Sequence, residues 1–166
     1  MPGYMQSTDD GYAAYCQCFL GGGRGKGIRT FVDIPRHRWP KEWIGKYKRP
    51  VIQLILDLYG HPDAGGYWEK HCSKHLQSCG FDPIPNWPSM FWNAELQLML
   101  MVYVDDFKLA GPKENLSKGW DIIRKAVDME EPQKLGHLLG CTHEQFSMTL
   151  SDGTVINGIK YNAEIS

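Results

Sequence analysis

The sequence predicts an α+β fold, in which strands and helices follow one another without strict alternation. Its 42% hydrophobic and 22% charged residues are typical of a globular chain. An apolar strand, a turn and a second strand occupy residues 96–110, and residues 64–79 and 115–129 carry apolar side chains at helical spacing. A length of 166 residues fits one domain, and no internal repeat is visible.

The first third of the chain predicts little regular structure. Residues 11–20 are apolar, and their pattern fits either the end of a strand or the start of a helix. Residues 21–27 (GGGRGKG) predict a loop, because glycine favours no regular element. Residues 30–34 predict a short strand closed by Pro35, and the proline-rich stretch up to Pro50 is expected to be irregular.

The rest of the chain carries stronger signals. Residues 51–58 are apolar, residues 64–79 predict a helix that stops at Gly80, and residues 81–89 predict a surface connector.

Strands at 99–104 and 107–110 should pair about a turn at Asp105-Asp106. Asn115 is expected to cap a helix that runs to about Met129. Residues 135–141 predict a strand, and residues 146–150 and 154–159 predict a hairpin turned by residues 151–153.

Charge and cysteine content limit the classes of function. The net charge of −1 provides no overall attraction to nucleic acid or to an anionic membrane. Residues 24–49, however, hold nine Lys or Arg against Asp33 and Glu42, with Trp39, Trp43 and Tyr47 interleaved. This stretch predicts either a phosphate-binding surface with stacking groups or a solvated loop whose tryptophans lie in the core. The longest apolar run, 96–104, is too short for a membrane span, and five cysteines without a disulfide framework favour a reducing intracellular compartment, cytoplasmic or nuclear.

Two adjacent carboxylates, Asp105 and Asp106, interrupt the apolar strand-turn-strand segment. Like charges repel, and carboxylates near a core destabilise the fold unless a cation compensates them. Carboxylate oxygens are the ligands that Mg²⁺ prefers, so the pair is a candidate metal site. Aspartate is also an ordinary turn residue, which is the structural alternative.

Three other short blocks accompany the YVDD segment at residues 103–106. They are DGYAAY at 10–15, LYG at 58–60 followed by Trp68 and Gly80-Phe81, and LLG at 138–140. In type and order these four blocks resemble the reverse transcriptases of copia-type LTR retrotransposons. Together they extend from Asp10 to Gly140, which is nearly the whole chain.

The resemblance implies a palm, that is, an antiparallel sheet backed by helices, and DNA synthesis on an RNA or DNA template with a primer and deoxynucleoside triphosphates. Asp10, Asp105 and Asp106 would hold two Mg²⁺ ions, or Mn²⁺, with Asp106 the less direct ligand. One ion would activate the primer 3′-hydroxyl and the other would neutralise the leaving pyrophosphate. Asp9 directly precedes Asp10 and remains an alternative motif residue. Tyr15 would lie beneath the incoming sugar, or else pack in the core.

The chain also departs from the family. Asp63 stands where a glutamine would contact the template or the nucleotide, and a negative charge beside a triphosphate is unfavourable. The chain begins nine residues before Asp10, so the fingers are expected to be incomplete. Residues 1–166 are therefore interpreted as one partial reverse transcriptase domain, with motifs in 9–141 and a C-terminal hairpin at 143–160. The alternative is a catalytically inactive remnant with at most weak nucleic-acid binding.

Two further patterns are weaker indications of a binding site. His71, His75 and Cys79 repeat at every fourth residue and would present three zinc ligands on one helix face, although an amphipathic face explains them equally. The glycine-rich residues 21–27 lack the Ser or Thr that follows the lysine in a phosphate-binding loop.

Overall fold

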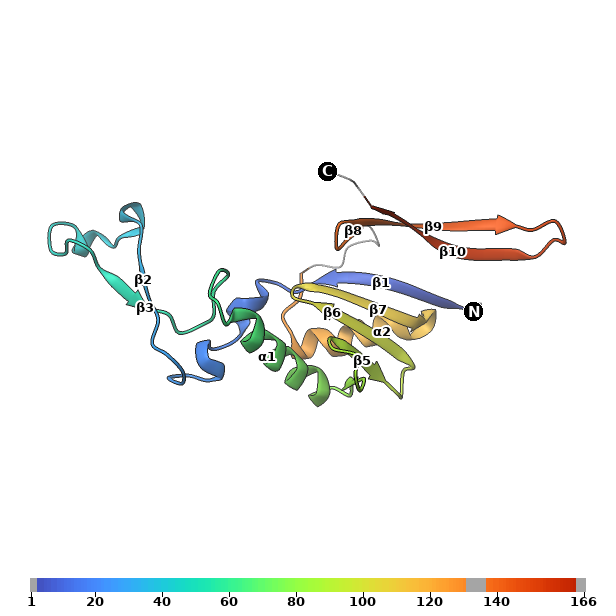
Figure 1. Cartoon of the computed structure of the whole chain (residues 1–166), viewed down its shortest axis with the longest axis horizontal. Coiled ribbons are helices and arrows are strands. Elements are labelled where there is room, and N and C mark those ends of the chain that lie inside the picture. The colour runs from blue at the N-terminus through green and yellow to red at the C-terminus, as the bar shows by residue number, and fades with distance from the viewer. Residues whose placement is uncertain (1–2, 131–136, 164–166) are drawn as a thin grey trace. The chain divides into compact units, whose positions relative to one another are not determined.

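The structure, a computed structural model, describes residues 3–130 and 137–163 (Figure 1). It mixes strands with helices, so the predicted α+β class is confirmed at that level. The contacts divide the chain into two units. Unit 1 comprises Met1–Tyr12 and Ser73–Ser166, and unit 2 comprises Ala13–Cys72.

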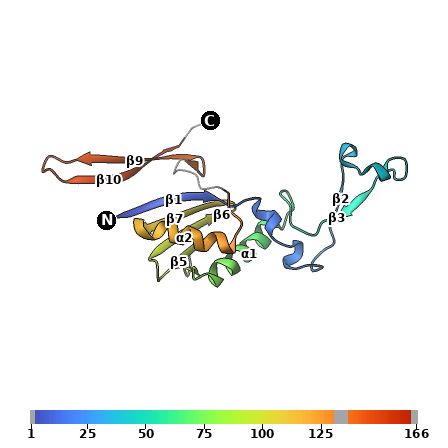
Figure 2. The same cartoon turned by 180° about the vertical axis from the view of Figure 1, so that it is seen from behind.

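A five-stranded antiparallel sheet forms the centre of unit 1 (Figure 2). Its strand order is β1-β7-β6-β5-β4, so the first strand of the chain lies at one edge beside the last strand of this sheet. The strands are β1 (Tyr4–Asp10), β4 (Asp82–Pro83), β5 (Met90–Asn93), β6 (Leu98–Tyr103) and β7 (Asp106–Pro112).

Side chains of β5, β6 and most of β7 alternate between a buried and a more accessible face. On the buried face, Leu100 of β6 and Leu109 of β7 pair directly, and both are fully inaccessible to solvent. The helix α2 (Lys113–Ala126) packs against β7, β1 and β6. Its apolar side chains recur at helical spacing, as the sequence predicts, and they are Leu116, Trp120 and Ile123.

The boundaries of α2 differ from the prediction. Pro112, whose φ is fixed near the helical value, directly precedes the helix, so Asn115 is not the cap. The Asn115 side-chain amide instead donates a hydrogen bond to the Leu96 carbonyl at 2.8 Å. The helix ends at Ala126 rather than near Met129, because Val127 is extended and buried and the following residues join the end of β1.

The helix α1 (Ala64–Ser78) confirms the prediction for residues 64–79. Gly80, with a φ of +88°, ends it. The Gly80 amide donates to the Gln77 carbonyl and the Phe81 amide donates to the Leu76 carbonyl, which is the Schellman arrangement. The prediction of an irregular connector at 81–89 is wrong in part, since Phe81 is fully buried and β4 pairs with β5.

The C-terminal part of unit 1 is a second, three-stranded antiparallel sheet in the order β10-β9-β8. Its strands are β8 (His137–Leu138), β9 (Cys141–Thr149) and β10 (Val155–Ala163). The predicted hairpin is confirmed with longer strands than expected, and its turn lies at residues 150–154. The first residues of the strand predicted at 135–141 lie outside the described part. No helix within the described ranges has the length and apolar character to cross a membrane.

Unit 2 holds little regular structure beyond the first part of α1. Short 3-10 turns occupy Ala14–Gln17 and Leu20–Gly22, which resolves the ambiguity at residues 11–20. The strands β2 (Phe31–Asp33) and β3 (Val51–Gln53) form a two-stranded ribbon. The connection between them is irregular apart from two single 3-10 turns, as its prolines predict.

Candidate functional site

The YVDD segment forms a tight hairpin between β6 and β7. Tyr103 and Asp106 are the closing pair, so Val104 and Asp105 make the turn. The sequence predicts a turn one residue later, at Asp105-Asp106. The structure corrects this register: Asp105 lies in the turn, whereas Asp106 is the first residue of β7.

Val104 adopts a left-handed backbone conformation, with a φ of +56°. Tight hairpins need a positive φ because only such turns match the twist of the flanking strands. A β-branched residue is disfavoured there by about 1–2 kcal/mol. The turn that carries Asp105 is therefore strained, a property that clusters at functional sites.

Strand pairing places Asp10 beside this hairpin. β1 and β7 are antiparallel, and Asp10 and Asp106 are register partners. The Gly11 amide donates a hydrogen bond to the Asp105 carbonyl at 2.6 Å. Strand pairing thus brings the backbone of Asp10 next to the Asp105-Asp106 hairpin, although the two motifs stand far apart in the sequence. The roles assigned to these residues stay predictions.

Asp9 and Asp10 point to opposite faces of β1, because successive side chains alternate along a strand. Asp9 is 2% exposed, pairs in register with the buried Phe107, and forms an ion pair with Arg124 of α2. Asp10 lies on the face of Asp106. Arg124 already neutralises Asp9, so the structure favours Asp10 as the available carboxylate.

The surroundings of Asp10 are strongly acidic. Burial raises the pKa of Asp10, and the charges of Glu130, Asp9 and Asp105 raise it further. Glu130 approaches because the segment after α2 runs beside the end of β1, where the Glu130 amide donates to the Asp10 carbonyl at 2.7 Å. Glu130 is not predictable as a neighbour of Asp10 from the sequence, because no local motif links the two residues.

This charge cluster predicts a pH-dependent stability. The folded-state pKa of Asp10 is raised, so its contribution to stability is greatest below the unfolded pKa and is lost as pH rises through the folded pKa. Asp10→Asn should therefore raise the melting temperature at pH 7, and the gain should vanish near pH 3.5. Thermal unfolding at both pH values measures this. Asp121→Asn, which changes an exposed carboxylate of α2, is the matched control, and a variant that melts lower than wild type at pH 7 would contradict the prediction.

The oxygen donors suit a hard divalent cation, because Asp10, Asp105, Asp106 and Glu130 offer carboxylates alone. A cation would also relieve the repulsion that raises the pKa of Asp10. Within residues 3–130 and 137–163, however, no three His, Cys, Asp or Glu side chains are arranged to hold a metal ion. The backbone brings the carboxylates to one place, while the side chains are not gathered around a common point.

Tyr15 and Asp63 belong to unit 2. The Tyr15 ring lies against the ring of Tyr59, with centroids 4.5 Å apart, which links the DGYAAY and LYG blocks within that unit. Asp63 is exposed and immediately precedes α1, and its carbonyl accepts a hydrogen bond from the Tyr67 amide. A carboxylate at this helix end is favoured by the helix dipole, which gives Asp63 a structural reason to be acidic.

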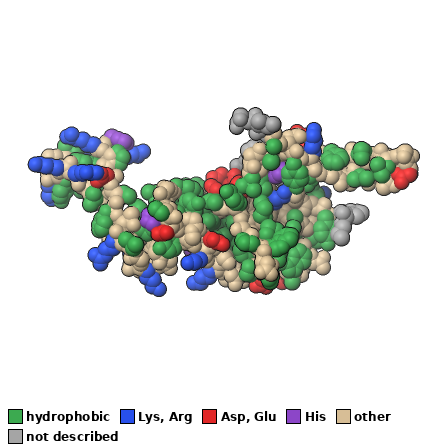
Figure 3. All heavy atoms as spheres, viewed as in Figure 1, with side chains coloured by type: hydrophobic (Ala, Val, Ile, Leu, Met, Phe, Trp, Pro, Cys, Tyr) green, Lys and Arg blue, Asp and Glu red, His purple; other side chains and the backbone are tan. Residues whose placement is uncertain are grey.

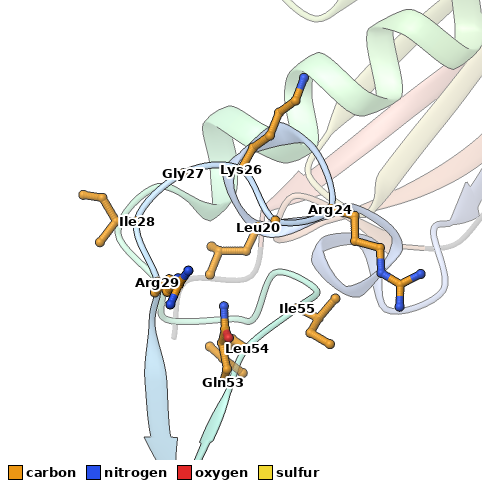
Figure 4. A pocket seen from close by; sticks show the side chains of 10 residues that line it. Leu20, Arg24, Lys26, Gly27, Ile28, Arg29, Gln53, Leu54 and Ile55 are labelled. Carbon is orange, nitrogen blue, oxygen red and sulfur yellow. The ribbon is translucent and has the colours of Figure 1, made fainter.

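The glycine-rich residues 21–27 close into a tight ring. A Cβ on Gly21 would lie 2.2 Å from the Lys26 carbonyl oxygen, so only glycine fits this position. The ring borders a cavity of about 380 Å³ (Figure 4). The side chains of Arg24 and Lys26 extend away from each other there, so the ring does not gather cations around a phosphate.

The described His and Cys side chains form no group of three that could bind zinc. Cys79 donates to the Leu76 carbonyl, and burial raises its thiol pKa. Cys18 is 2% exposed, and burial, followed by the nearby Asp57 charge, raises its pKa to about 11. A protonated, buried thiol behaves as a small apolar side chain, so Cys18 acts as a packing residue.

Comparisons with protein-family models, with curated proteins and with solved structures find no match to this chain. The candidate site therefore rests on the motifs of the sequence and on the geometry described above.

Proposed function

We propose that the chain is the palm-centred part of a copia-type reverse transcriptase, and that the intact protein joins deoxynucleotides to a primer on an RNA or DNA template. The observation that carries the proposal is the register of β1 with β7. This register sets the aspartate of the DGYAAY block opposite Asp106 of the YVDD hairpin. In such an enzyme, acidic residues from these two blocks would have to meet on one antiparallel sheet.

The reaction forms a bond between the primer 3′-oxygen and the α-phosphorus of the incoming nucleotide. The bond from that phosphorus to the pyrophosphate oxygen breaks, and the hydroxyl proton is lost to solvent. Asp10 and Asp105 would hold two Mg²⁺ ions, with Asp106 contributing mainly charge. Bound Mg²⁺ would supply charge neutralisation and acidify the primer hydroxyl. The strained, hydrogen-bonded turn would keep the Asp105 backbone in place against β1.

The second candidate is a catalytically inactive remnant that retains weak nucleic-acid binding. Asp63 favours it, because an exposed anion replaces the glutamine expected beside the substrate.

Primer extension by the intact parent polyprotein separates the two candidates. With Mg²⁺, a primed RNA template and four deoxynucleotides, we expect synthesis that falls at least about 1,000-fold in Asp10→Asn and in Asp105→Asn, because metal ions supply several kcal/mol of transition-state stabilisation. Asp121→Asn removes a carboxylate away from the hairpin and should leave synthesis unchanged. Wild-type protein without extension would favour the inactive remnant, and extension that survives Asp105→Asn would refute the assigned site.

A further inference from the structure

Residues 24–56, here called the basic arm, lack a core of their own. None of their side chains is buried, and several large apolar ones are strongly exposed, including Ile28 at 84% and Ile44 at 59%. The only sheet in the basic arm is the two-stranded β2–β3 ribbon. A lone ribbon is at best marginally stable in water, so this segment needs a binding partner to become firmly ordered.

The positive charge of the basic arm indicates that its binding partner is negatively charged. Nine of the chain's 18 Lys and Arg residues lie here, against Asp33 and Glu42. Asp33 is already paired with Arg49, so Glu42 is the remaining acidic residue that could offset the other eight Lys and Arg side chains. Figure 3 shows Lys and Arg side chains gathered around the part of the chain that contains β2 and β3. Such a local excess attracts polyanions even though the whole chain is nearly neutral.

The aromatic residues of the basic arm lie among these cations instead of filling a core. Trp39 and Trp43 are half-buried, which rules out the alternative that they are core residues. Arg36 lies over the Trp39 ring at 5.9 Å, Lys46 lies over the Tyr47 ring at 5.4 Å, and Trp43 meets Tyr47 edge to face. Tyr47 is 45% exposed, so it can accept a stacked base.

We propose that the basic arm is a binding surface for single-stranded nucleic acid, with phosphates on Arg36, Arg38, Lys46 and Lys48 and a base on Tyr47. Cations contact the backbone, whereas exposed rings favour unpaired bases over a duplex. This inference does not depend on the polymerase proposal, because the basic arm contains none of the acidic motif residues.

Fluorescence anisotropy with a labelled 20-nucleotide single-stranded DNA tests the surface at several salt concentrations. Replacing Arg36, Arg38, Lys46 and Lys48 with glutamine should weaken binding at least about tenfold at 100 mM salt. The slope of the logarithm of the binding constant against the logarithm of the salt concentration should become less steep by up to about 3 units. The matched control replaces four exposed lysines outside the basic arm, Lys70, Lys74, Lys113 and Lys125, and should bind nearly as wild type. Equal losses in both variants, or no binding by the wild type at low salt, would overturn the proposal.

A second pair of variants tests stacking. Tyr47→Leu should weaken single-stranded DNA binding about tenfold, while Tyr47→Phe, which keeps the ring, should not. The affinity for heparin, a polyanion without bases, should be the same in both variants as in the wild type. If Tyr47→Leu has no effect on DNA, the surface is a general polyanion site and the proposal fails. None of these binding results depends on DNA synthesis, so failure of the polymerase assay would leave them interpretable.

Discussion

Arg124→Met is expected to lower the free energy of unfolding by about 3–5 kcal/mol, because it leaves the Asp9 carboxylate buried without its counter-charge. The Asp9 side chain is 1% exposed and that of Arg124 is 29% exposed, so partial access of water places the expected loss near the lower end of this range. Urea unfolding followed by circular dichroism measures it.

A double variant identifies the cause of this loss. Asp9→Asn combined with Arg124→Met removes both charges and should be more stable than Arg124→Met alone. Lys125→Met alters an exposed neighbour on the same helix and should change stability by no more than about 0.5 kcal/mol. If the double variant is less stable than the single one, the buried charge is not what destabilises Arg124→Met.

Phe107→Ala should destabilise the fold by about 3–5 kcal/mol, since deletion of a fully buried ring leaves a cavity. Phe107 follows Asp106 directly and pairs in register with Asp9 and Val102, so its ring lies under the strands that carry the candidate site. Thermal or urea unfolding provides the measurement.

Tyr103→Ala is the control for this variant. It removes an aromatic ring from the same hairpin, but that ring is 58% exposed, so the loss should stay near 0.5 kcal/mol. Phe107→Leu, which fills part of the space, should fall between the two. A Phe107→Ala protein as stable as Tyr103→Ala would show that the ring does not support the sheet.

Local patterns of the sequence predict much of the fold. Helical spacing followed by Gly80 correctly places α1, and the apolar flanks of Asp105-Asp106 predict the β6–β7 hairpin. In both cases the signal lies within a few residues of the element that it determines. The one-residue error in the turn arises because Val104, a poor turn former by propensity, takes the left-handed position.

Long-range contacts explain what the sequence could not predict. Asn115 resembles a helix cap, but its side-chain amide donates to the carbonyl of Leu96, which lies in the turn between β5 and β6. In the sequence, only the spacing to Ala14 and Tyr15 favours Asp10 over Asp9, whereas the ion pair of Asp9 with Arg124 is visible only in the structure. Glu130 reaches Asp10 through backbone pairing that has no local signature.

The β1–β7 pairing also sets when the candidate site can form. Its two halves are about a hundred residues apart, so closing this loop carries a large entropic cost that local contacts do not repay. The β6–β7 hairpin and α2 can form early from neighbouring residues, whereas β1 must wait for them. During synthesis on the ribosome, Asp10 emerges well before β7 and reaches its final neighbours only after that strand has been made.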